Sequence, residues 1–187
     1  MPPKVRIIKE DIIKTALELV RTGGRDAINA RAIATALNCS TQPIFSNFAS
    51  MEELEEAVMA SAHEKYLELL KTESESGKYP QYKSFGMAYI RFAKEESELF
   101  KLLFMCDRKD KTLPHTVDFD TSVEMIMTAN GITREKAVLI HLEMWIFVHG
   151  IGTMLATSFL PLEWELISDM LTDVYRGIRV RHLSEGN

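Results

Sequence analysis

The stretch that decides the fold runs from Ala27 to Phe48 and reads AINARAIATALNCSTQPIFSNF. Its apolar residues recur at the spacing of two short helices, because each set falls on one face when three or four residues separate its members. These residues are Ile33, Ala34 and Leu37 in the first helix, and Ile44 and Phe48 in the second. The stretch therefore predicts a helix, a tight turn and a second helix.

Polar residues in this stretch mark where the two helices begin and end. Asn29 is suited to cap the first helix, and Asn38 tolerates the left-handed backbone that a tight turn needs. Ser40 or Thr41 is expected to cap the second helix, and Pro43 suits its first turn, where a missing N–H costs nothing.

A further helix precedes this pair and ends at Gly23-Gly24, where glycine supplies a positive φ. Its apolar stripe is Ile8, Ile12, Ala16, Leu19 and Val20. Three such helices match the helix-turn-helix plan, in which the last helix enters the major groove of DNA. The side chains expected to reach bases or phosphates are Thr41, Gln42, Ser46 and Asn47, with Arg31 and Ser40 on phosphates.

Residues 6–60 resemble the DNA-binding domain of the TetR family of bacterial repressors. The resemblance rests on the Ile-Ala pair of the second helix, the aromatic residue inside the third helix, and the segment Ser50-Met51-Glu52-Glu53-Leu54, which is similar to the start of the family's fourth helix. It implies that Phe45 stands where a tyrosine usually contacts phosphate. It also implies base-reading or groove-lining roles for Thr41, Gln42 and Pro43, and backbone-contacting roles for Arg31 and Asn47.

Three residues depart from the family pattern. Asn38 replaces a turn glycine, Phe45 lacks the hydroxyl that would bind phosphate, and Met51 stands where a lysine is common. Phe45 retains only apolar contact, and losing a cation at position 51 lowers phosphate affinity and its salt dependence. These departures bear on affinity and on the choice of DNA sequence.

The remainder of the chain also reads as helix, so the fold class is all-α with about nine helices. The expected helices span 51–71, 82–94, 97–105, 117–129, 133–159 and 163–181. Residues 1–50 form the expected helix-turn-helix domain, and 51–187 form a larger effector-binding and dimerisation domain. The segment from Leu99 to Phe104, with Trp145-Ile146-Phe147-Val148-His149-Gly150, resembles the family's Trp-x-x-x-His-Gly type of effector domain.

Methionine and aromatic residues are frequent in this larger domain, and the chain holds ten Met and nine Phe. Adaptable apolar side chains suit a site for an apolar small molecule, although plain core packing also uses them. The expected effector site consists of Phe85, Tyr89, Phe104, Met125, Met144, Trp145 and His149. Tyr89 and His149 are its polar groups.

His141, Trp145 and His149 share one helix face, which raises the alternative of a metal site. The two histidines lie about 12 Å apart along the axis, too far to reach one ion readily. Core or ligand-lining roles are favoured, and no metal or cofactor is expected. Gly150 and Gly152 each lower the stability of a helix by roughly 1 kcal/mol relative to Ala. We therefore expect another helix or a ligand to approach the backbone closely at these positions; the alternative is a local weakness that the helix tolerates.

The last two expected helices carry apolar stripes that predict a homodimer through a four-helix bundle, an arrangement that the family resemblance also implies. The alternative is that the stripes only close the core of one protomer. The expected interface residues are Ile151, Leu155, Trp164, Ile167, Leu171 and Val174.

Composition and charge limit the classes of function that the protein can have. The net charge is −5, yet residues 1–50 hold seven Lys/Arg against four Asp/Glu, so this segment carries +3 and the rest −8. A basic N-terminal segment followed by an acidic remainder is typical of a protein in which only the basic segment contacts phosphates. Two cysteines, Cys39 and Cys106, exclude a disulfide framework. Without a signal peptide or an uninterrupted apolar stretch of ~18 residues, a cytoplasmic protein is expected.

No enzyme motif is present: the sequence lacks a Gly-rich phosphate loop, G-x-S-x-G and H-E-x-x-H. The prediction is a non-enzymatic repressor that binds a palindromic operator and is released by a small apolar effector. The sequence leaves open whether the ligand releases or promotes DNA binding. The alternative is a helical ligand-binding or scaffold protein with lost or weakened DNA binding, which Phe45 and Met51 favour.

Overall fold

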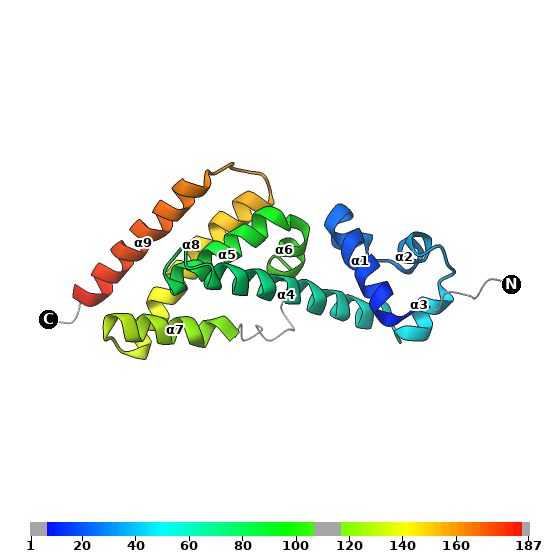
Figure 1. The fold of residues 1–187 in the computed structure, drawn as a ribbon, viewed down its shortest axis with the longest axis horizontal. Helices are drawn as coiled ribbons and strands as arrows, with labels where there is room; N and C mark the ends of the chain where they lie inside the picture. The colour runs from blue at the N-terminus through cyan, green and yellow to red at the C-terminus, as the bar shows by residue number, and fades with distance from the viewer. Residues whose placement is uncertain (1–6, 107–116, 185–187) are drawn as a thin grey trace. The chain divides into compact units, whose positions relative to one another are not determined.

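The computed structural model describes residues 7–106 and 117–184, and within these ranges the chain is helical with no strand. The expected all-α class is confirmed. Figure 1 shows the helices in chain order. They are α1 (Lys9–Gly23), a 3₁₀ turn (Arg25–Ala27), α2 (Ala30–Ala36), α3 (Gln42–Asn47), α4 (Met51–Glu75), α5 (Gln81–Glu95), α6 (Ser97–Phe104), α7 (Val117–Asn130), α8 (Arg134–Ala156) and α9 (Trp164–Ser184).

The described residues divide into two compact units. The first comprises residues up to 68 together with 96–106, and the second comprises 69–95 together with the residues from 117 onward. Helix α4 therefore contributes to both units, and α6 belongs with α1, α2 and α3 although α5 and α7 flank it in the chain.

The first unit has a small core of its own. Helix α1 turns Ile12, Ala16 and Val20 inward, and each is fully buried. Further buried side chains come from α2, α3, α4 and α6, and they are Ile33, Ile44, Leu54, Val58, Leu99 and Phe100.

In the second unit, α5 packs against α8 and α9, and α7 packs against α8. Gly86 of α5 permits this close approach. A Cβ at Gly86 would lie 3.1 Å from Leu171 Cδ2 and 3.3 Å from Val148 Cγ2. A separate apolar cluster joins α7 to α8, and it consists of Val123, Ile126, Ala137 and Ile140.

The expected helix over 133–159 is too long at its C-terminal end. Helix α8 stops at Ala156, and Ser158 adopts a φ of +53°. The N–H of Phe159 donates to the carbonyl of Met154 (2.9 Å), and the N–H of Ser158 donates to that of Leu155 (3.0 Å). These two bonds form a Schellman motif, which satisfies the last carbonyls with a non-glycine residue in the left-handed position.

Helix α8 is also long and apolar enough to cross a membrane by length and composition, with a mean hydropathy of 1.5 over its best window. A core helix of a soluble protein meets the same criterion, so this is weak evidence for a membrane span. Only 28% of that window is buried inside the protomer.

Candidate nucleic-acid interface

The turn between α2 and α3 is built as the sequence predicts. The side-chain Oδ1 of Asn29 accepts the N–H of Ala32 (2.9 Å) and caps α2. Asn38 has a φ of +51°. Its N–H donates to the carbonyl of Thr35 (3.1 Å), and the N–H of Cys39 donates to that of Ala34 (2.9 Å). A second Schellman motif therefore ends α2, and both asparagines have their predicted roles.

Helix α3 begins differently from the expectation. Thr41 occupies the N-cap position in a helical conformation and makes no side-chain capping bond, so the predicted Ser40 or Thr41 cap is wrong. The N–H groups of Ile44 and Phe45 donate to the carbonyl of Thr41 instead (3.1 and 3.3 Å). Pro43 sits in the first turn, as expected.

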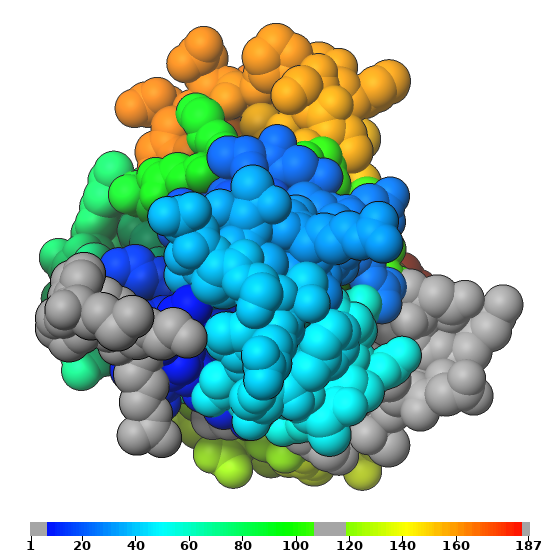
Figure 2. Space-filling model, turned by 90° about the vertical axis from the view of Figure 1, so that its right-hand side faces the viewer, coloured from blue at the N-terminus to red at the C-terminus, as the bar shows by residue number. Residues whose placement is uncertain are grey.

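Two buried residues anchor α3 and thereby expose its opposite face. Ile44 and the following Phe48 are buried, whereas Gln42, Phe45 and Ser46 are exposed. Figure 2 shows α2 and α3 at the surface of the first unit. The remaining predicted DNA contacts divide into exposed Arg31 and Ser40 and half-buried Thr41, Pro43 and Asn47.

Two of the predicted contacts bond to the helix itself. The Ser46 hydroxyl donates to the carbonyl of Gln42 (2.8 Å), and the Asn47 amide donates to that of Pro43 (2.7 Å). In the absence of DNA, these two donors therefore form hydrogen bonds within α3. Neither Gln42 nor Arg31 has a side-chain hydrogen bond or ion pair with another residue in the part of the chain that the structure describes.

The positive charge of the N-terminal segment is partly neutralised. Lys9 pairs with Glu53 (3.0 Å), Arg25 pairs with Glu55 (2.9 Å), and Arg21 is paired as described below. The Glu55 carboxylate raises the pKa of Arg25. Lys4 and Arg6 lie outside the described residues. Fewer cations of residues 1–50 are therefore unpaired than the sequence count implies, and exposed Arg31 has no acidic partner among the described residues.

Helix α4 begins shortly after α3, and side chains at its first turn bond to the backbone in the manner of a capping box. The Glu53 N–H donates to Ser50 Oγ (3.3 Å), and the Glu53 carboxylate accepts the N–H of Ala49 (2.7 Å). The bond from Ala49, followed by that from Lys9, lowers the pKa of Glu53. The Glu53 carboxylate thus binds the N–H of Ala49 rather than that of the N-cap Ser50, so the motif is a variant of the capping box.

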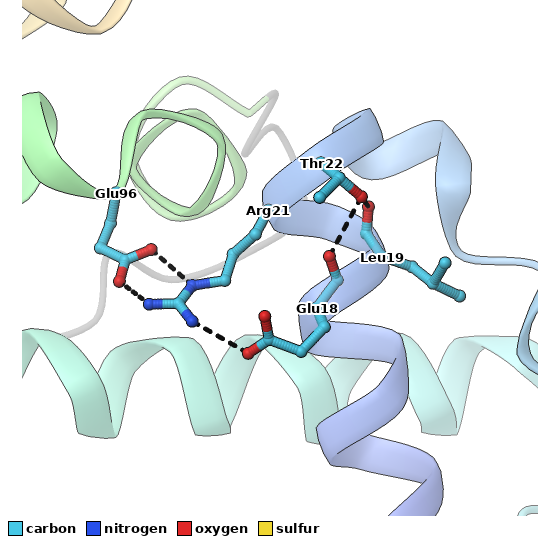
Figure 3. Close-up of polar contacts among 5 residues, drawn as sticks. All are labelled: Glu18, Leu19, Arg21, Thr22 and Glu96. Atoms are coloured by element: carbon cyan, nitrogen blue, oxygen red, sulfur yellow. Dashed lines mark hydrogen bonds and ion pairs between the residues drawn. The ribbon is translucent and has the colours of Figure 1, made fainter. Parts of the chain in front are cut away.

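Helix α6 is held to α1 by an ion pair that sequence reasoning missed. Arg21 Nε donates to Glu96 Oε2 (2.7 Å), its Nη2 contacts the other carboxylate oxygen, and its Nη1 donates to Glu18 (2.9 Å), as Figure 3 shows. The partners Arg21 and Glu96 are 75 residues apart. No local pattern in the sequence signals a pairing at this separation.

The expected effector residues are only partly brought together. In the second unit, the Tyr89 hydroxyl lies 2.8 Å from His149 Nδ1, and the Trp145 ring stacks on the His149 ring with centroids 5.5 Å apart. Burial lowers the pKa of His149. Met144 is buried, Phe85 and Met125 are half-buried, and Trp145 is exposed.

Phe104 belongs to the first unit, whereas the other six expected effector residues belong to the second. Its ring packs against Tyr66 and Phe100, with centroids 5.4 and 5.3 Å away.

His141 is half-buried and has partners of its own. Its Nδ1 lies 3.0 Å from the Tyr82 hydroxyl, and the rings of Tyr82 and Phe119 pack against it. Burial lowers the pKa of His141 to about 4 and raises that of Tyr82. No group of three metal-ligating side chains occurs among the described residues, so the two histidines are best understood as partners of tyrosines.

Three of the six expected interface residues are interior. Ile151, Ile167 and Leu171 are buried within the second unit, so they pack the protomer and are not exposed contacts. Leu155, Trp164 and Val174 are half-buried. The large exposed apolar side chains of α8 and α9 are Leu139, Leu142, Trp145, Ile146, Met154, Leu166, Val180 and Leu183.

Comparison with solved structures identifies related folds. A TetR-like transcriptional regulator from Rhodococcus sp. RHA1 superposes with a TM-score of 0.65 at 16% identity, covering 100% of both chains. The multidrug binding protein EbrR, solved in complex with imidazole, superposes with a TM-score of 0.61 at 13% identity, covering 89% of this chain and 93% of EbrR. No family model and no curated protein matches the sequence. The chain therefore has the fold of the TetR-like transcriptional regulators.

Proposed function

We propose that this protein is a DNA-binding transcriptional regulator that acts as a repressor. The observation that carries the proposal is the exposed face of α3, held by the buried side chains of Ile44 and Phe48 and by the turn at Asn38. A short helix anchored on one side and polar on the other is the arrangement that a helix-turn-helix protein places in the major groove. The fold that it shares with a TetR-like transcriptional regulator supports the same function.

Selection of bound duplexes from a random DNA pool at low salt tests this proposal. We expect enrichment of an inverted repeat, since one helix-turn-helix per chain reads one half-site and a two-fold dimer presents two. Failure to enrich any sequence would contradict DNA recognition.

The proposed assembly is a homodimer formed through α8 and α9. Leu139, Leu142, Ile146 and Gly150 recur at helical spacing on α8, and the three side chains are 43–60% exposed in the protomer. On α9, Leu166, Gly177 and Val180 share one face. Nothing in the described residues lies within 4 Å of a Cβ placed on Gly150 or Gly177. Both glycines thus leave room for close approach of a partner helix, which suits a four-helix bundle.

The proposed effector is a small, largely apolar molecule that binds the second unit near Tyr89 and His149. The hydroxyl–imidazole pair, with the stacked Trp145 ring, offers polar groups among apolar side chains. EbrR, which has a similar fold, is a multidrug binding protein. An effector that binds better to the DNA-incompetent state would shift the population by its ratio of affinities and release the operator.

The effector proposal predicts a rise in melting temperature with members of an apolar compound library, because a ligand of the folded state stabilises it. Tyr89→Phe and His149→Ala should reduce that rise, whereas Met105→Ala in the first unit should not. A library with no stabilising member would contradict effector binding and favour constitutive repression.

A further inference from the structure

Helix α3 exposes one large apolar side chain on an otherwise polar face. Gln42, Phe45 and Ser46 are spaced i, i+3 and i+4, so they share a face, and all three are exposed. The Phe45 side chain is 53% exposed, whereas its neighbours Ile44 and Phe48 are 0% and 1% exposed. The phenyl ring therefore takes no part in the core of the first unit.

The hydrogen bonds within α3 limit what this face offers to an outside partner. Ser46 and Asn47 already donate to carbonyls of the same helix. The Gln42 amide has no hydrogen bond to any of the described side chains or carbonyls, and the Phe45 ring has no aromatic or cationic partner among them. The Gln42 amide and the Phe45 ring, one helical turn apart, are therefore the two exposed groups of this face whose side chains make no hydrogen bond or ring contact with the described residues.

Resting on the proposed function, we infer that Phe45 contacts the C5-methyl group of a thymine and sets a preference for thymine at one position of each half-site. This methyl group is the only alkyl group among the base edges of the major groove, which otherwise present mainly hydrogen-bond donors and acceptors. A phenyl ring against any other edge would desolvate donors and acceptors without pairing them, which costs free energy. The methyl group is therefore the group in the major groove that the apolar Phe45 ring is best suited to contact.

Gln42 extends the inference to the neighbouring base pair. Its amide is suited to pair with adenine N6 and N7. Side chains at i and i+3 are about 5–6 Å apart, which corresponds to one or two base-pair steps of ~3.4 Å. We expect an adenine one or two pairs from the thymine that Phe45 contacts.

Replacement of thymine by uracil tests the methyl contact, because uracil keeps the pairing and removes the methyl group. The probe is the duplex selected from the random pool, with deoxyuridine substituted at one symmetric pair of thymine positions at a time, and the readout is the Kd by fluorescence anisotropy. One pair of positions should weaken wild-type binding about fourfold per half-site, the factor that corresponds to burying one methyl-sized group.

Variants separate this contact from a general loss of affinity. Phe45→Ala should bind thymine and uracil duplexes equally, and Phe45→Leu, which retains an apolar side chain, should keep part of the discrimination. Met105→Ala, a matched control at an exposed apolar residue of the same unit, should discriminate as the wild type does. Thermal unfolding of Phe45→Ala confirms that it folds, as expected for a side chain outside the core.

The outcomes distinguish the inference from the proposed function. Wild-type binding that is indifferent to uracil at every thymine position, or equal discrimination by Phe45→Ala, would overturn the methyl contact while DNA binding stands. Enrichment of no duplex from the pool would overturn the proposed function and the inference with it.

Discussion

Arg31 and Gln42 are both exposed on the α2–α3 surface, yet their chemistry predicts different effects on DNA binding. An arginine on phosphate contributes the same free energy at every sequence, so Arg31→Ala should weaken all duplexes alike and reduce the slope of log K against log salt by about 0.9. Gln42→Ala should instead change which duplexes are preferred. Kd measurements on selected and scrambled duplexes at several salt concentrations check both, and a sequence-selective effect of Arg31→Ala would contradict the assignment.

His141 makes stability depend on pH. Burial holds its pKa at about 4 in the folded protein, against an ordinary value of 6.5. Between pH 4 and pH 6.5, His141 takes up a proton in the unfolded chain but not in the folded protein. Its contribution to the free energy of unfolding is therefore complete above pH 6.5 and is lost as the pH falls toward 4. His141→Gln should reduce this loss. Urea unfolding at pH 7.5 and 5.5 measures it, and an unchanged difference between the two pH values in the variant would count against burial as the cause.

At the scale of elements, Gly86 and Gly177 predict opposite results for the same substitution. An Ala at Gly86 would press on Leu171 and Val148, which are both buried, at a cost of about 1–3 kcal/mol, so after the gain of about 1 kcal/mol in helix propensity Gly86→Ala should destabilise the protein by up to about 2 kcal/mol. Gly177 has open space around it within the protomer, so Gly177→Ala should stabilise the isolated protomer by about 1 kcal/mol through helix propensity, although it would crowd the proposed partner helix. Chemical denaturation compares them, and a stabilising Gly86→Ala would show that α5 and α9 separate easily.

The ion pair between α1 and α6 predicts another contrast. Glu96 is 19% exposed and binds Arg21 through both oxygens, whereas Glu18, the other partner of Arg21, is 54% exposed. Glu96→Gln should lower the free energy of unfolding by about 1–2 kcal/mol, and Glu18→Gln by less than about 0.5 kcal/mol. Equal effects would mean that the pair does not hold α6 to α1.

Local features of these elements could be predicted from the sequence, and long-range ones could not. Asn29 caps α2 and Asn38 turns the chain because each acts on backbone groups within a few residues. The place of Phe104 beside Tyr66, and of α6 beside α1, depends on residues far apart in the chain. Helical periodicity likewise finds the apolar stripes of α8 and α9 but does not tell which stripe faces the protomer, which is why Leu171 was assigned to the interface although it is buried.

For the whole molecule, the proposed dimer predicts that a charge on the exposed stripe of α8 produces monomers. Ile146 is 60% exposed, so Ile146→Glu should leave the protomer folded while placing an unpaired carboxylate in the partner contact. Leu171→Glu would be a poorer test because it disrupts the protomer itself. Sedimentation velocity gives the mass, with Met105→Glu in the first unit as a control that stays dimeric. A dimeric Ile146→Glu protein would place the interface elsewhere.

The claim that the exposed face of α3 reads DNA is tested most directly by a mobility-shift assay on DNA from upstream of the protein's own gene. At low salt, the wild-type protein should shift such a fragment, and the shift should weaken as salt rises. A variant carrying Gln42→Ala and Phe45→Ala together should fold as the wild type does and lose the specific shift. No shift of any genomic fragment by the wild-type protein at low salt would contradict the account.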